Sequence, residues 1–180
     1  TVLDAMDRDP SYRFAQSMAQ IYADLERDDP ELFERIRARV AEGRWEVVGG
    51  MWVEPDGNLP SGEAWARQLL LGQRWLASRF GEPSTVGWLP DTFGYAANLP
   101  QLLRLAGITG FFTTKLEWND RDRFPHDLYR WEGIDGSRVL AHQLRNPSGG
   151  YNGLVEAGAL LASWENYDGK RWHDASLYVF

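Results

Sequence analysis

The sequence of 180 residues contains no cysteine and no long apolar run. Without cysteine the chain has no disulfide bond and no thiolate nucleophile or metal ligand, although this does not decide the compartment. No apolar run approaches the roughly 18 residues of a membrane-spanning helix, and no signal-peptide pattern opens the sequence. The net charge of −7 argues against a nucleic-acid partner, because phosphate binding needs clustered positive charge. We therefore expect neither nucleic acid nor a membrane as a partner.

The residues that are present are typical of a globular domain, with 43% hydrophobic and 25% charged side chains. The unusual feature is the nine tryptophans. Aromatic faces pack against the C–H faces of sugar rings, so an acidic, tryptophan-rich chain is compatible with carbohydrate binding. Core packing explains any single tryptophan equally well, because an aromatic side chain buries much apolar area.

Strand-like and helix-like stretches alternate along the chain. We expect strands at residues 12–15, 45–49, 85–89 and 110–114, with helical patterns between them. Such alternation predicts an α/β fold with a largely parallel sheet. Asp135-Gly136, between two further strand-like runs, predicts a β-hairpin, and residues 176–180 read as a final strand.

One stretch, residues 88–95 (WLPDTFGY), organises the rest. Pro90 ends the preceding strand because it has no N–H to donate. Asp91 therefore follows the carboxyl end of a strand, the edge at which α/β folds collect ligands and catalytic groups. Trp88, Phe93 and Tyr95 are expected to wall and partly desolvate this carboxylate. The alternative is an aspartate that only caps the next turn, with aromatic side chains that belong to the core.

A second loop, residues 50–60, also follows the end of a predicted strand. It carries Trp52, Glu54 and Asp56, which would face a cleft at that edge. For Asp56, followed by Gly57, turn formation is the favoured interpretation. For Glu54 the sequence leaves both interpretations open.

Five ordered motifs stand at characteristic spacing: residues 43–54 (GRWEVVGGMWVE), 58–63 (NLPSGE), 88–95 (WLPDTFGY), 99–101 (LPQ) and 115–119 (KLEWN). Together they resemble glycoside hydrolase family 38, the zinc-dependent retaining α-mannosidases, most closely their cytosolic and bacterial branch. The resemblance extends from Tyr12 to about His142.

The resemblance implies a partial irregular (β/α) barrel with a largely parallel sheet, incomplete at both ends. Residues 1–180 would form part of an N-terminal catalytic α/β-barrel domain, and the helical and β-sandwich domains that follow it in the family are absent from this sequence. The chain begins in a helical pattern and ends on an apolar, strand-like run, which agrees with that expectation.

The resemblance also implies roles for single residues. Asp91 would be the catalytic nucleophile and a ligand of one Zn²⁺ ion. The remaining zinc ligands and the general acid are expected outside residues 1–180. The three histidines, His126, His142 and His173, form no H-x-H or H-x-D pair, and we expect His142 to be a hydrogen-bonded core residue rather than a metal ligand.

Four further residues are expected to bind substrate. Phe93 matches an aromatic residue that lies against the sugar, and Lys115 a basic position near the nucleophile, where a cation favours the ionised form of Asp91. Trp118 and Asn119, in the adjoining loop, are weaker candidates. The alternatives are core packing for Phe93 and an ordinary solvated lysine for Lys115.

The resulting expectation is a zinc-dependent retaining α-mannosidase that hydrolyses terminal α-linked mannosides through a covalent glycosyl-aspartate intermediate. Its partner would be an α-mannoside or oligosaccharide, its compartment the cytoplasm, and this piece alone would be inactive. A homo-oligomer is left open. Two alternatives stand beside it: a metal-dependent polysaccharide deacetylase, and a non-catalytic carbohydrate-binding domain.

Overall fold

The computed structural model describes residues 1–118, 120–144 and 153–179, and shows a mixed α/β fold. The helices are α1 (Val2–Arg8), α2 (Ala19–Asp28), α3 (Pro30–Ala41), α4 (Gly62–Phe80), α5 (Leu99–Leu105) and α6 (Ala157–Asn166), with the 3₁₀ helices η1 (Lys115–Glu117) and η2 (Asp168–Arg171). The strands are β1 (Phe14–Gln16), β2 (Trp45–Val47), β3 (Val86–Trp88), β4 (Gly110–Thr113), β5 (Leu128–Glu132) and β6 (Arg138–Gln143).

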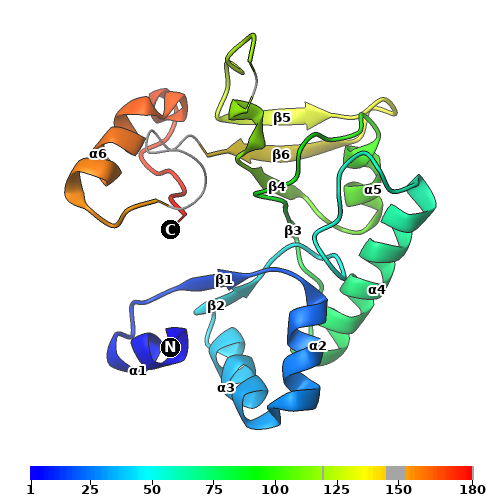
Figure 1. Cartoon of the computed structure of the whole chain (residues 1–180), viewed down its shortest axis with the longest axis vertical. Helices are drawn as coiled ribbons and strands as arrows, with labels where there is room; N and C mark the ends of the chain where they lie inside the picture. Colours follow the sequence, from blue (N-terminus) through cyan, green and yellow to red (C-terminus); the bar gives the residue numbers. More distant parts are fainter. Residues whose placement is uncertain (119, 145–152, 180) are drawn as a thin grey trace.

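The strands form two sheets, both visible in Figure 1. Strands β1 and β2 pair in parallel, and the second sheet has the order β3-β4-β6-β5. In it, β3, β4 and β6 are parallel, whereas β5 pairs antiparallel to β6 across the Asp135-Gly136 turn. The predictions of a largely parallel sheet and of the hairpin are therefore confirmed.

The two sheets are joined by a backbone hydrogen bond, in which the Gly49 N–H donates to the Val86 carbonyl over 2.7 Å. The strands thus follow one another around a curve, but within the described residues they do not close, and the predicted barrel is not confirmed. The final strand, expected at residues 176–180, was wrong for residues 176–179, which adopt no strand; Phe180 lies outside the described residues. Among the described residues no strand pairs with this segment, and a strand needs a partner for its backbone groups.

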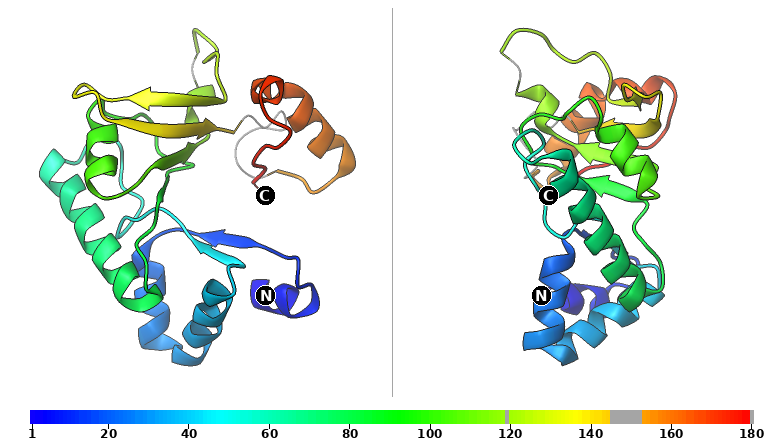
Figure 2. Two further views of the ribbon diagram at one scale, coloured as in Figure 1. Left: turned by 180° about the vertical axis from the view of Figure 1, so that it is seen from behind. Right: turned by 90° about the vertical axis from the view of Figure 1, so that its right-hand side faces the viewer.

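Helix α4 packs against both hydrophobic clusters of the molecule. The Ser61 hydroxyl caps its start by accepting from the Ala64 N–H (3.2 Å), and Gly81 ends it in the left-handed conformation (φ 90°). Figure 2 shows that α4 runs along the outside, from α2 and α3 to the larger sheet. Its buried face contributes Trp65 and Leu69 to one hydrophobic cluster and Leu76 to the other. It therefore ties the two sheets into one unit.

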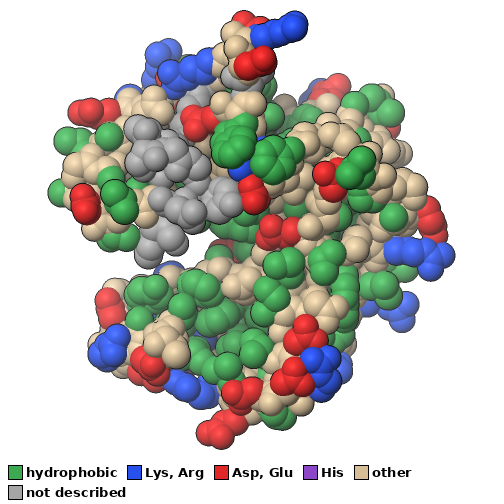
Figure 3. All heavy atoms as spheres, in the orientation of Figure 1, with side chains coloured by type: hydrophobic (Ala, Val, Ile, Leu, Met, Phe, Trp, Pro, Cys, Tyr) green, Lys and Arg blue, Asp and Glu red, His purple; other side chains and the backbone are tan. Residues whose placement is uncertain are grey.

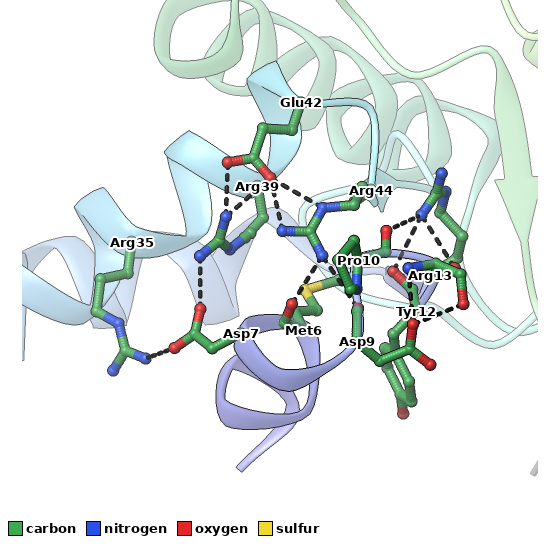
Figure 4. Close-up of polar contacts among 11 residues, drawn as sticks. Met6, Asp7, Asp9, Pro10, Tyr12, Arg13, Arg35, Arg39, Glu42 and Arg44 are labelled. Carbon is green, nitrogen blue, oxygen red and sulfur yellow. Dashed lines mark hydrogen bonds and ion pairs between the residues drawn. The ribbon is translucent and has the colours of Figure 1, made fainter.

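Helix α1 is held to α3 by a charged network, drawn in Figure 4. Arg39 binds both Asp7 and Glu42, and Arg44 binds Glu42. The Arg44 side chain, only 12% exposed, also donates to the Met6 carbonyl over 2.9 Å. These contacts fix the segment that leads into β2.

An open cavity of about 420 Å³ lies between the β1–β2 sheet and residues 177–179. Side chains and backbone from β1, from the start of β2 and from residues 177–179 line it. Figure 3 shows hydrophobic side chains gathered beside the hollow below α6, with charged side chains mostly on the outer margins. Among the described residues, no helix combines the length and apolar character needed to traverse a lipid bilayer.

Candidate active site

The residues of the candidate site follow the carboxyl ends of parallel strands; among them, Ser17 was not predicted from the sequence. Ser17 follows β1, Asp91 follows β3 and Lys115 follows β4, while the loop after β2 leads to Glu54. In parallel sheets these ends share one edge, and ligands bind there because the loops converge. The strand order therefore brings together groups that are far apart in the sequence.

Asp91 and Lys115 form an ion pair. The Lys115 Nζ lies 2.6 Å from Asp91 Oδ1, a short, charge-assisted hydrogen bond. The Lys115 side chain is only 3% exposed and that of Asp91 is 50% exposed. The prediction of a cation beside Asp91 is thus confirmed, and the alternative of a solvated lysine is wrong.

Two aromatic rings cover the buried lysine. Its Nζ lies 3.6 Å from the centroid of the Trp118 ring and 4.6 Å from that of Phe93. The two rings meet edge to face, 5.3 Å apart, and both side chains are more than half exposed (57% for Phe93 and 65% for Trp118). Phe93 is therefore not a core residue. An exposed aromatic pair beside a carboxylate is a surface against which the C–H face of a sugar ring can pack.

A buried polar network sets the turn that carries Lys115. The side chain of Gln143 on β6, fully buried, donates to the Thr114 carbonyl over 2.9 Å and accepts from the Leu116 N–H at 3.3 Å. The Thr114 hydroxyl donates to the Pro90 carbonyl over 2.6 Å, one residue before Asp91. The two loops that carry the ion pair are thus held by hydrogen bonds that are shielded from water.

The loop after β2 packs closely on the Asp91 loop. A Cβ atom on Gly57 would lie 1.9 Å from the Gly94 carbonyl oxygen, so only glycine fits. The buried Thr92 hydroxyl donates to the Pro55 carbonyl over 3.3 Å. Asp56 accepts from the N–H groups of Asn58 (2.8 Å) and Leu59 (2.7 Å), which confirms its interpretation as a turn residue.

Glu54, in the same loop, has a different role from Asp56. It is half-buried, and its Oε1 accepts a hydrogen bond from the hydroxyl of the buried Ser17. Burial raises the pKa of Glu54, the Ser17 hydrogen bond lowers it, and the negative charge of Asp91 raises it further. The hydrogen bond between Thr92 and Pro55 places Glu54 and Asp91 on adjoining loops. The sequence placed Glu54 at this edge but did not distinguish a turn residue from a site residue.

The other two predicted aromatic neighbours of Asp91, Trp88 and Tyr95, contact side chains of the larger sheet. Trp88 stacks on Phe112 across β3 and β4, with ring centroids 4.2 Å apart. The Tyr95 hydroxyl donates to the Leu89 carbonyl (3.1 Å), and its ring meets Phe111 edge to face. Trp88 and Tyr95 thus each have a packing partner in the larger sheet, and the expected three-sided aromatic wall around Asp91 stays a prediction. Asn119 lies outside the described residues.

The described residues do not build a metal centre by themselves. Within them, no group of three or more His, Cys, Asp or Glu side chains has the arrangement needed to hold a metal ion. A catalytic zinc site takes three protein ligands, so this part of the chain does not fit a complete site. His142 stacks between Phe112 and Tyr167. Neither of its ring nitrogens has a hydrogen-bond partner among the described residues, so the predicted hydrogen-bonded histidine is wrong in that respect.

Comparison with known proteins matches the whole chain to one family. A model of the glycosyl hydrolases family 38 N-terminal domain matches residues 1–180. Alpha-mannosidase G of Dictyostelium discoideum is 48% identical over 161 residues, which are 89% of this chain and 15% of that protein. Alpha-mannosidase 2C1 of Homo sapiens is 44% identical over 180 residues, which are 100% of this chain and 17% of that protein. The chain thus spans less than a fifth of the length of these curated relatives.

A solved structure supports the same architecture. The crystal structure of an alpha-mannosidase from Enterococcus faecalis V583 matches with a TM-score of 0.70 and 24% sequence identity. The match covers 91% of this chain and 19% of that chain. At 24% sequence identity, this structural similarity supports the fold of the chain and nothing further.

Proposed function

Because the chain belongs to glycosyl hydrolase family 38, we propose that it forms part of the N-terminal catalytic domain of an α-mannosidase. The substrate class is a terminal α-linked mannoside. The observation that carries the proposal is the presentation of Asp91 at a strand end, bound to the buried Lys115 and beside the exposed rings of Phe93 and Trp118. This arrangement combines a held carboxylate with a surface for the apolar face of a sugar.

The proposed reaction follows the retaining route. The Asp91 carboxylate attacks the anomeric carbon while the bond to the leaving oxygen breaks, and a general acid protonates that oxygen. Water then hydrolyses the glycosyl-aspartate, which restores Asp91 and gives the sugar with its original anomeric configuration. Lys115 holds one carboxylate oxygen and favours the ionised form that attack requires. We expect a residue outside 1–180 to act as the general acid. This chain alone is therefore expected to show no turnover.

Zinc belongs to the proposal as an expectation from the family. Asp91 is the candidate ligand in this chain, and the other ligands are expected from segments outside residues 1–180. When bound, the ion would stabilise negative charge and orient sugar hydroxyl groups near the reacting carbon. The further domains of the α-mannosidase and a cytoplasmic location also stay predictions.

The test uses the complete protein that carries this chain, loaded with zinc, with an aryl α-mannoside as the substrate. Asp91→Asn keeps the shape of the side chain and removes the nucleophile, so we expect kcat to fall by about a thousandfold or more. The matched control is Asp56→Asn, which changes a carboxylate of the neighbouring loop that binds only backbone N–H groups in the described structure. Equal activity of wild type and Asp91→Asn would place the nucleophile elsewhere.

Trapping separates this proposal from its alternatives. A fluorinated α-mannoside slows the second step, so the retaining mechanism predicts a covalent adduct whose mass maps to the peptide containing Asp91. A polysaccharide deacetylase forms no glycosyl-enzyme, and a non-catalytic binding domain has no turnover. Absence of both turnover and adduct in the zinc-loaded complete protein would contradict the proposal.

A further inference from the structure

Glu54 is the second carboxylate at the edge where Asp91 lies. It comes from the loop after β2, and its side chain turns toward the end of β1, where the Ser17 hydroxyl donates to Oε1. Ser17 is 5% exposed, so this hydrogen bond is shielded from water and fixes the carboxylate in one orientation. The carbonyl of the next residue, Pro55, accepts a hydrogen bond from the Thr92 hydroxyl over 3.3 Å, so Glu54 and Asp91 lie on adjoining loops.

The other oxygen of Glu54 is left open for a ligand. Oε2 has no hydrogen bond or ion pair with any described residue. The cation of the site, Lys115, forms its ion pair with Asp91. A half-buried carboxylate without a cation is costly, since burial disfavours the charged form. The neighbouring Asp56 shows the contrast, because both its hydrogen bonds close a local turn.

We propose that Glu54 binds the substrate: its Oε2 accepts a hydrogen bond from one hydroxyl group of the sugar held at Asp91. This inference rests on the proposed function and adds a residue that selects the sugar. A carboxylate fixed by Ser17 accepts a hydroxyl at one position only, so it favours sugars that place a hydroxyl group there. The hydrogen bond involves a charged group, and its removal is expected to cost about 10- to 100-fold in kcat/KM.

The rival interpretation gives Glu54 a structural role, as a tie between the ends of β1 and β2. The two roles differ in what a substrate change does. A hydrogen bond to one hydroxyl is lost either from the enzyme side or from the sugar side, and losing both costs no more than losing one. A structural tie weakens activity on every substrate by the same factor.

The experiment compares wild type, Glu54→Gln and Glu54→Ala in the complete zinc-loaded protein. Each is assayed with an aryl α-mannoside and with a series of mannosides that each lack one hydroxyl group. Glu63→Gln is the matched control, because Glu63 is exposed on α4 and pairs with Arg67. Thermal unfolding of every variant reports on folding. Even if both Glu54 variants unfold, the deoxy series on wild type still measures whether one hydroxyl is recognised.

We expect both Glu54 variants to lose about 10- to 100-fold in kcat/KM on the full mannoside. On one deoxy substrate they should equal wild type, and Glu63→Gln should follow wild type throughout. An equal loss on all substrates, full activity of Glu54→Gln, or a wild type indifferent to every single deoxygenation would overturn the assignment. If wild type hydrolyses no mannoside at all, the proposed function fails first and the assignment fails with it.

Discussion

The Nζ of Lys115 lies 2.6 Å from Asp91 Oδ1, and the cation is buried while the carboxylate is half exposed. This asymmetry has a physical origin. The rings of Trp118 and Phe93 cover the lysine and replace part of its hydration by cation–π contacts. The lysine is therefore the fixed partner, and Asp91 is the group presented to a ligand.

Removing this cation should reduce activity more than stability. Lys115→Met keeps the apolar stem but removes the ion pair with Asp91, so we expect kcat/KM on an aryl α-mannoside to fall about 100-fold. The half-exposed Asp91 can recover hydration, which limits the loss of unfolding free energy to about 1 kcal/mol. Lys115→Arg keeps the charge and should retain most of the activity. Steady-state kinetics and denaturant unfolding check the two parts, and an active Lys115→Met variant would remove the cation from the site.

The close approach of two loops predicts an intolerant glycine. In Gly57→Ala the new methyl carbon would meet the Gly94 carbonyl oxygen, so the Asp91 loop must move. We expect a loss of at least about 2 kcal/mol in unfolding free energy, typical of overpacking, together with lower activity. Gly62→Ala is the control, because its added methyl carbon would point into open space at the start of α4. Equal unfolding midpoints for the two variants would contradict the prediction.

Local signals and strand order were sufficient to predict much of the fold and part of the site. The hairpin turn at residues 135–136 depends on neighbouring residues only, and it is confirmed. The place of Lys115 beside Asp91 was implied by the family resemblance, and it agrees with strand order because consecutive strands of a βαβ unit place their carboxyl ends side by side.

Contacts between distant side chains were not accessible in the same way. Ser17 and Glu54 are 37 residues apart, and Gln143 reaches the Lys115 turn only because β6 pairs with β4. The directions of Trp88 and Tyr95 depend on which face of each element is buried, and a one-residue shift in register moves every side chain of a strand to the opposite face. The roles of Asp91, Phe93, Lys115, Trp118 and Asn119 in catalysis and binding stay predictions.

The arginine network between α1 and β2 predicts a difference between two arginines. Arg44→Ala removes a nearly buried guanidinium and leaves the Met6 carbonyl without that donor. We expect the unfolding free energy to fall by about 1–3 kcal/mol. Arg67→Ala removes a pair in which both side chains are about 70% exposed, and should change it by less than about 0.5 kcal/mol. Denaturant unfolding of the chain measures both values, and equal losses would contradict the buried role of Arg44.

The buried ring of His142 predicts a pH dependence of stability. Burial lowers its pKa from 6.5 to about 4. Between these pH values His142 is therefore protonated in the unfolded chain and neutral in the folded chain. The contribution is fully present above pH 6.5 and is lost as the pH falls to about 4, by about 3 kcal/mol. His142→Phe keeps an aromatic ring between Phe112 and Tyr167 and does not titrate. The difference in unfolding free energy between this variant and wild type should therefore be constant above pH 7 and grow in the variant's favour toward pH 4. A difference that is independent of pH would show that the folded chain accepts the proton at His142.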